Sequence, residues 1–97
     1  MPKAYLIVCY REVKAPDVLA AYAILAGPAV LANGGRILAR GGRVKSLEGG
    51  IDERTVVIEF DNFDAAVAHY NSDAYQKAIA LLGDAAIRDM RVVEAVE

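Results

Sequence analysis

Three charged residues on neighbouring segments, Arg40, Arg54 and Glu59, are candidates for binding a ligand or for acid–base catalysis. Glu59 lies in the apolar run 55–60, and a charge within such a strand needs a partner. Arg40 precedes a glycine pair in the segment 34–50, and Arg54 starts the run that carries Glu59. A carboxylate beside a guanidinium forms either a structural ion pair or the polar end of a ligand site. In an enzyme, Glu59 would be the base and Arg40 the anion anchor.

His69 and Tyr22 add two further groups. His69 is the only histidine, so a site with several histidine ligands is excluded. Histidine titrates near neutral pH, so His69 is a candidate general base or haem ligand, and the alternative is a packing or surface role. Tyr22, with Tyr5 and Tyr10, either lines a pocket or places its hydroxyl at the edge of the core. The ligand-binding candidates are therefore Arg40, Glu59, Tyr22, Arg54 and His69, with no metal site and no cofactor expected.

Composition indicates one domain, residues 1–97, that associates with itself. Of the 97 residues, 56% are apolar, which exceeds the usual ~45–50%. A chain of this size hides only roughly two-thirds of its unfolded surface, so the surplus apolar surface predicts an oligomer. The single cysteine, Cys9, cannot form an internal disulfide, and we expect it to pack as a small apolar group in a reduced, cytoplasmic protein.

Charge and patterning exclude two classes of partner. The net charge is −2 and contains no basic block, which argues against nucleic acid. The positions where an RNA-recognition sheet carries stacking aromatics read Thr55, Val57 and Glu59, which offer no stacking platform. The apolar segment 4–10 is too short to span a membrane and has no cleavage site after it, so no membrane association is expected.

Periodicity predicts the elements that must position these residues. A helix should begin at Pro16 and be kinked or broken at Gly27-Pro28, with a second piece at 29–32 that stops at Asn33. Strands are expected at 4–11, 35–45, 54–61 and 88–96. Two further helices are expected, one at 63–70 capped by Asp61-Asn62 and one at 74–87 after a break and new cap at Asn71-Ser72-Asp73.

The glycine-rich segment 34–50 should contain a bent edge strand. Regular alternation would place Arg36, Leu38 and Arg40 on one face and Ile37 and Ala39 on the other. The glycine pair at 41–42 suggests a bulge or bend. The arginines would then form the rim of a pocket or a partner contact, or simply a solvated edge.

The predicted order is ferredoxin-like, βαββαβ, an α+β fold with a four-stranded antiparallel sheet. Helices would cover the sheet face that carries Val56, Ile58 and Phe60. The other face would carry Val57, with Ile7 and Cys9, and is too apolar to meet water. Packing this face on that of a second copy would close a dimeric α+β barrel.

Four blocks of sequence resemble the bacterial family called domain of unknown function 1330. They are Gly-Gly-Arg-x-Leu-Ala-Arg-Gly-Gly at 34–42, Arg-x-Val-Val-x-Glu-Phe at 54–60, Tyr-Asn-Ser-x-x-Tyr at 70–75 and Val-Val-Glu at 92–94. The resemblance implies the dimeric α+β barrel, which cofactor-free monooxygenases and haem-degrading enzymes share, and implies no particular activity. His69 departs from the family's pattern, which has an aromatic residue such as tryptophan there.

Function can be stated only as alternatives. The first hypothesis is a homodimeric module that binds a small organic ligand or is purely structural. The second is a cofactor-free enzyme of the monooxygenase or isomerase kind acting on a small organic substrate. The third is haem binding through His69.

Overall fold

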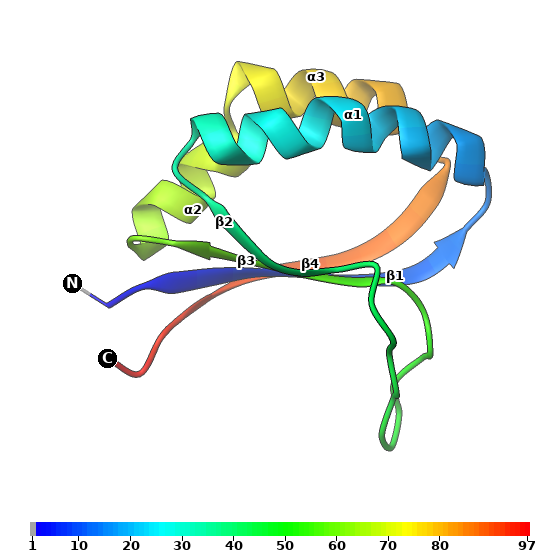
Figure 1. Cartoon of the computed structure of the whole chain (residues 1–97), viewed down its shortest axis with the longest axis horizontal. Helices are drawn as coiled ribbons and strands as arrows, with labels where there is room; N and C mark the ends of the chain where they lie inside the picture. Colours follow the sequence, from blue (N-terminus) through cyan, green and yellow to red (C-terminus); the bar gives the residue numbers. More distant parts are fainter. Residues whose placement is uncertain (1) are drawn as a thin grey trace.

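The computed structural model describes residues 2–97 as a four-stranded antiparallel sheet with helices on one face (Figure 1). The elements are β1 (Ala4–Val13), α1 (Pro16–Ala32), β2 (Arg36–Arg40), β3 (Thr55–Phe60), α2 (Phe63–Tyr70), α3 (Asp73–Leu82) and β4 (Ala86–Glu94). The strand order is β2-β3-β1-β4. The predicted α+β, ferredoxin-like fold is confirmed, with the second helical segment divided into α2 and α3.

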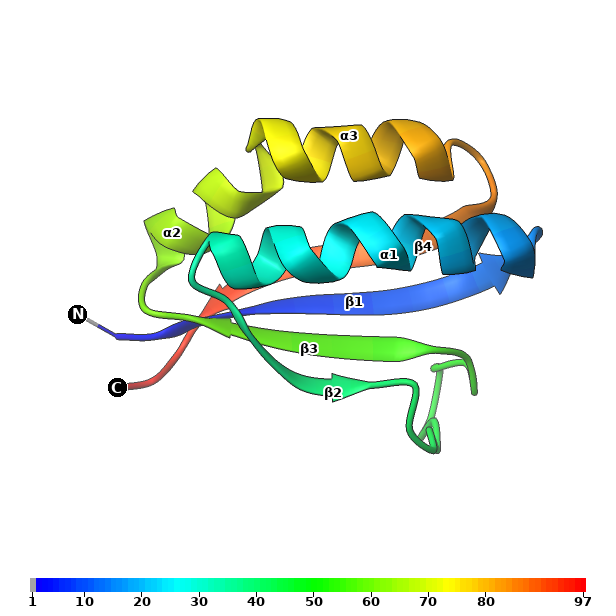
Figure 2. The ribbon, with the colours of Figure 1, turned by 45° about the horizontal axis from the view of Figure 1, so that its top comes forward.

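The core lies between the sheet and the helices because alternate residues of the two central strands are apolar. In β1, Ala4, Leu6, Val8 and Tyr10 are buried, and they pair in antiparallel register with β3. Figure 2 shows α1 and α3 lying side by side over this face. A second buried cluster joins these two helices to each other around Tyr22, Tyr75 and Leu82.

Helix α1 runs unbroken through Gly27-Pro28, so of the two predicted alternatives the break is wrong and the kink stays a prediction. Pro28 removes the backbone bond to Ile24, but both residues lie on the exposed side of the helix, where water can satisfy the freed carbonyl. That side is apolar: residues 18–35 include no charged side chain, and Ile24 is 74% exposed, with Leu25 and Leu31 beside it.

The other two helices begin at the predicted caps. The Asn62 Oδ1 accepts from the Ala65 amide at 2.8 Å and starts α2, and the Ser72 Oγ accepts from the Tyr75 amide at 3.2 Å and starts α3. Helix α3 ends at Leu82 rather than near residue 87, because Gly83 has a φ of 54°. Strand β4 is correspondingly displaced toward the N-terminus from the predicted 88–96.

Strand β2 departs most from the prediction. It stops at Arg40 rather than near Lys45, because Gly41 turns the chain with a φ of 74°. Its register with β3 skips Leu38: Ile37 pairs with Ile58, and Ala39 pairs with Val57. Because of this bulge, Arg40 joins Ile37 on the helix-facing side instead of sharing a face with Arg36.

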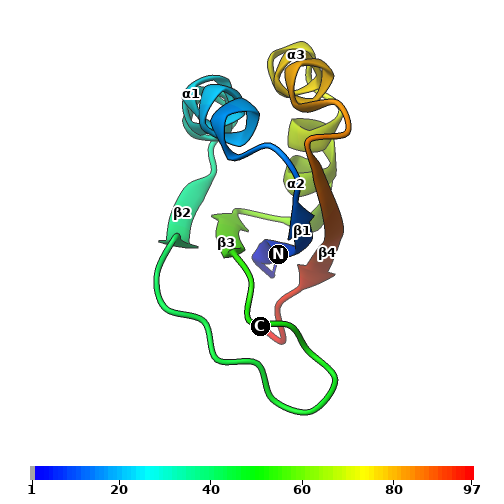
Figure 3. The same ribbon diagram turned by 90° about the vertical axis from the view of Figure 1, so that its right-hand side faces the viewer.

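No helix among residues 2–97 covers the sheet face opposite α1 and α3, and the segment between β2 and β3 lies on that side (Figure 3). We call this sheet face the open face. Tyr5, Ile7 and Val57 are half-buried on it, and Cys9 is exposed, so the prediction that Cys9 packs as an apolar group does not hold within one chain.

Gly35 offers a test of the packing between α1 and the sheet. A Cβ atom at Gly35 would lie 2.7 Å from the Val30 Cγ1 and 2.9 Å from the Phe60 Cζ. We predict that Gly35→Ala lowers the free energy of unfolding by about 1–3 kcal/mol through overpacking, measured by urea denaturation. Gly42→Ala is the control, because nothing lies within 4 Å of its Cβ position, and equal losses for both variants would contradict the packing argument.

Candidate functional site

A pocket of about 50 Å³ lies between α1 and the helix-facing side of the sheet. Most of its wall is aliphatic and comes from β1, β3, β2 and α1: Leu6, Val8, Val56, Ile58, Ile37, Ala23, Ala26 and Val30. The polar part consists of three tyrosines and three arginines: Tyr10, Tyr22, Tyr75, Arg40, Arg54 and Arg88. The pocket therefore combines an apolar interior with a cluster of positive charge.

Arg88 is held by two tyrosine hydroxyls. Its Nη1 donates to the Tyr22 Oη at 2.9 Å and to the Tyr75 Oη at 3.4 Å, and the two hydroxyl oxygens lie 2.6 Å apart. The Arg88 Cζ also lies 5.0 Å from the centre of the Tyr22 ring, within cation–π distance. Burial, together with the adjacent Tyr75, raises the pKa of Tyr22, so its hydroxyl stays protonated at neutral pH.

Arg54 and Arg40 are the less constrained members of the cluster. Arg54 lies with its Cζ 5.7 Å from the Tyr10 ring centre, and its Nε is buried with no hydrogen-bond partner among residues 2–97. Arg40 is exposed at the mouth of the pocket, with its Nη1 3.8 Å from the Cβ position of Gly27 on α1. Both guanidiniums can therefore accept a further partner.

No carboxylate neutralises this cluster. The ion pairs found among residues 2–97 involve other cations, and none includes Arg40, Arg54 or Arg88. Arginine stays protonated at any physiological pH, so the cluster carries three positive charges. Guanidinium groups bind carboxylate and phosphate oxygens with paired hydrogen bonds, which makes the pocket complementary to an anion.

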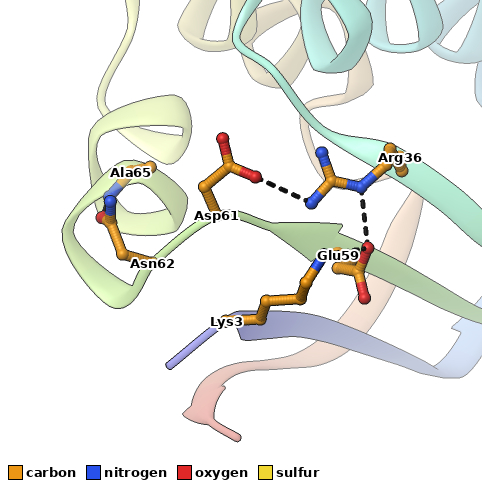
Figure 4. Close-up of polar contacts among 6 residues, drawn as sticks. All are labelled: Lys3, Arg36, Glu59, Asp61, Asn62 and Ala65. Carbon is orange, nitrogen blue, oxygen red and sulfur yellow. Dashed lines mark hydrogen bonds and ion pairs between the residues drawn. The ribbon is translucent and has the colours of Figure 1, made fainter. Parts of the chain in front are cut away.

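Glu59 lies on the opposite face of the sheet from this cluster. Figure 4 shows it beside Arg36 and Lys3. Its Oε1 accepts from the Arg36 Nε at 2.7 Å and lies 3.4 Å from the Lys3 Nζ, while the Arg36 Nη2 bridges to the Asp61 Oδ1 at 3.0 Å. The hydrogen bond from Arg36 holds the pKa of the Glu59 carboxyl below its usual range. The predicted pairing of Glu59 with Arg40 or Arg54 is therefore wrong, and so is a joint site for Glu59 and Arg40 within one chain.

His69 is packed in the core rather than in the pocket. It is 1% exposed, and its ring lies between Phe60 and Tyr75 at centroid distances of 5.2 and 4.6 Å. The Asn33 Nδ2 lies 3.0 Å from its Nδ1, and its Nε2 has no partner among residues 2–97. Burial lowers the pKa of the imidazole. A haem would have to displace the packed aromatic rings to reach this nitrogen.

The structure thus brings together three of the five candidates, Tyr22, Arg40 and Arg54, and leaves Glu59 and His69 elsewhere. Sequence reasoning missed Arg88 and Tyr75 as members of the pocket. Their contact joins β4 to α1 and α3, and no local pattern carries that information. The one available signal was that both are polar residues at positions otherwise occupied by core residues.

Residues 2–97 contain neither a metal-ligand cluster nor a helix suited to cross a membrane. No cluster of three or more histidine, cysteine, aspartate or glutamate side chains is placed to hold a metal ion. None of the helices in that range combines the length and apolarity that a membrane crossing requires.

Fold and pocket define a ferredoxin-like α+β protein with an arginine-rich pocket between sheet and helices. The chain belongs to the family described as Domain of unknown function (DUF1330), whose model matches residues 3–96. This bears out the resemblance noted in the sequence. Curated proteins give no match.

Several solved structures share the fold. The RPA0582 protein of unknown function from Rhodopseudomonas palustris is 22% identical, with a TM-score of 0.70 and coverage of 99% of this chain and 82% of that one. A candidate antibiotic biosynthesis monooxygenase from Caulobacter crescentus is 20% identical, with a TM-score of 0.65 and coverage of 99% and 92%. A dimeric ferredoxin-like protein of unknown function from Thermobifida fusca is 16% identical, with a TM-score of 0.62 and coverage of 97% and 92%.

The buried imidazole of His69 predicts a pH-dependent stability. In the unfolded chain its pKa is near 6.5, and burial lowers it in the folded state. Below about pH 6.5 the unfolded chain therefore takes up a proton more readily, and stability falls as the pH falls. The melting temperature should decrease between pH 7.5 and 5.5, and His69→Phe should flatten this decrease. Because His69 is the only histidine, an unchanged slope in the variant would contradict the assignment.

Proposed function

We propose that this protein is a homodimeric binding module for a small organic acid. The observation that carries the proposal is the cluster of three guanidiniums without a carboxylate partner at one end of an apolar pocket. Two of them, Arg40 and Arg54, have free hydrogen-bonding capacity toward the pocket. A bound carboxylate would satisfy the buried Arg54 Nε and reduce the repulsion within the cluster.

The apolar wall and the small volume narrow the ligand class. A volume of about 50 Å³ is below the ~150 Å³ of a cavity that holds benzene, so only a short apolar tail fits inside. Because Arg40 is exposed, we place the carboxylate at the mouth and the tail against Val56 and Ile58. Inorganic phosphate would meet the charges but leave the apolar wall without a partner.

The lining of the pocket favours ligand binding over proton-transfer catalysis. The pocket wall includes no carboxylate or imidazole, and the raised pKa of Tyr22 disfavours a phenolate base. The second hypothesis, a cofactor-free monooxygenase or isomerase, relied on Glu59 as base and Arg40 as anchor, which the sheet separates. The likeness to the Caulobacter protein is one of fold alone.

The open face supports the homodimer. Ile7 and Val57 are adjacent in register at its centre, and the charged pairs of Arg36–Glu59 and Arg91–Asp89 lie beyond them on either side. A half-buried apolar centre flanked by paired charges suits a two-fold contact with the same face of a second copy. The Thermobifida relative is described as dimeric, which agrees with this arrangement.

Ligand binding can be tested by thermal shift. Butyrate should raise the melting temperature, while the uncharged butyramide should not, because it lacks the carboxylate. Arg40→Gln and Arg54→Gln should each weaken carboxylate binding roughly tenfold or more, since each removes a charge-assisted hydrogen bond. Lys77→Gln is the control, because it removes a positive charge from the exposed side of α3, away from the pocket, and should leave carboxylate binding unchanged. Equal shifts with butyrate and butyramide would refute an anion site.

The dimer can be tested by sedimentation equilibrium. The wild type should have about twice the chain mass of 10.4 kDa at micromolar concentration. Val57→Asp should yield monomers, because it buries an unpaired charge in the contact. The matched control is Ile24→Asp on the exposed apolar side of α1. If Ile24→Asp abolished the dimer and Val57→Asp did not, the dimer would form through α1, and the proposal would be wrong.

A further inference from the structure

The segment between β2 and β3, residues 41–53, projects from the sheet on the side away from the helices (Figure 3). We call this segment the arm. Two arginines of the pocket flank the arm. Arg40 is the last residue of β2, and Arg54 directly precedes β3. The arm therefore connects the ligand pocket on one side of the sheet with the open face on the other.

The arm is organised by its own bonds. The Ser46 amide donates to the Asp52 Oδ1 at 2.5 Å, and the Glu53 amide donates to the Ile51 carbonyl at 2.8 Å. For residues 2–97, no hydrogen bond found for residues 41–53 reaches beyond Thr55. Within one chain the arm thus has a defined turn but little attachment to the body of the protein.

The tip of the arm carries two exposed aliphatic side chains among polar residues. Leu47 is 77% exposed and Ile51 is 51% exposed. A groove of about 290 Å³ separates the arm from the open face, and its wall includes Cys9 and Thr55 of the sheet and Val44 and Ile51 of the arm. The arm and groove are therefore continuous with the face that we assign to the dimer contact, and a second copy seated there would reach them as well.

We propose that the arm grips the second copy of the chain and that this contact sets the positions of Arg40 and Arg54, so that dimerisation and carboxylate binding reinforce each other. The inference rests on the proposed function. Its physical basis is that, among residues 2–97, the arm is attached only through the strands at its two ends, so packing of its tip would add the restraint that the interior of the arm lacks. Gly41, the first residue of the arm, lies against the Arg54 guanidinium: its Cβ position is 3.6 Å from the Nη1. A displacement of the arm therefore displaces this cation.

The proposed coupling between dimerisation and carboxylate binding can be measured from either equilibrium. If each site of the dimer binds carboxylate more tightly than the monomer does, saturating carboxylate must lower the dimer dissociation constant by the square of that factor, because the dimer holds two sites. Sedimentation of the wild type with and without saturating butyrate should show a dissociation constant at least threefold lower with butyrate. Butyramide, the neutral isostere, should leave it unchanged.

The decisive variants are Leu47→Ser at the tip of the arm and Ile24→Ser on α1, which remove aliphatic side chains of nearly equal exposure. Leu47→Ser should raise the dimer dissociation constant about tenfold and weaken butyrate binding measured at a fixed, low protein concentration. Ile24→Ser should change neither value. Both positions are exposed, so both variants should fold, and circular dichroism would verify this.

The failures of the two proposals are distinguishable. A wild type that does not bind butyrate overturns the proposed function, while the effect of Leu47→Ser on the dimer still tests the arm. An unchanged dimer in Leu47→Ser overturns the arm contact even if carboxylates bind. A weakened dimer whose butyrate affinity matches the wild type at every protein concentration overturns the coupling.

Discussion

The bulge in β2 decides how the charges of this protein are divided between the two faces of its sheet. With regular alternation, Arg36 and Arg40 would lie on the same side, and both would be available to Glu59. Because the register skips Leu38, Arg36 alone meets Glu59 on the open face, and Arg40 turns toward α1. One face therefore has its charges paired, whereas the other accumulates guanidiniums without carboxylates. The ligand specificity proposed for the pocket depends on that separation.

Two tyrosines orient the Arg88 guanidinium without neutralising its charge. A carboxylate beside Arg88 would fix the guanidinium but neutralise the pocket. The hydroxyls of Tyr22 and Tyr75 fix it with neutral acceptors, so the positive charge remains available to a ligand. The same two residues join α1 to α3, and the pocket is thereby attached to the second helical cluster of the core.

Local signals predicted most of the fold and little of the site. The caps at Asn62 and Ser72 marked helix starts because capping is a short-range interaction. The sequence order of strands and helices sufficed for the sheet topology. Arg40 was assigned to the wrong face because the alternation of residues along a strand does not reveal a bulge, and the bulge at Leu38 reverses the alternation after it. The contact of Arg88 with Tyr22 and Tyr75 could not be predicted, since it joins three elements that are distant in sequence.

The strand order has a consequence for how the chain reaches this state during synthesis. Strand β1 is the first to leave the ribosome, yet its partners β3 and β4 lie more than forty and seventy residues later. One edge of β1 can pair once β3 has emerged, but the other stays unpaired until β4 follows, and Leu6, Ile7 and Val8 form a segment prone to association in that interval. Residues 18–35 lack any charge that would discourage such contacts. The nascent chain is accordingly most exposed to aggregation in the interval before β4 pairs with β1.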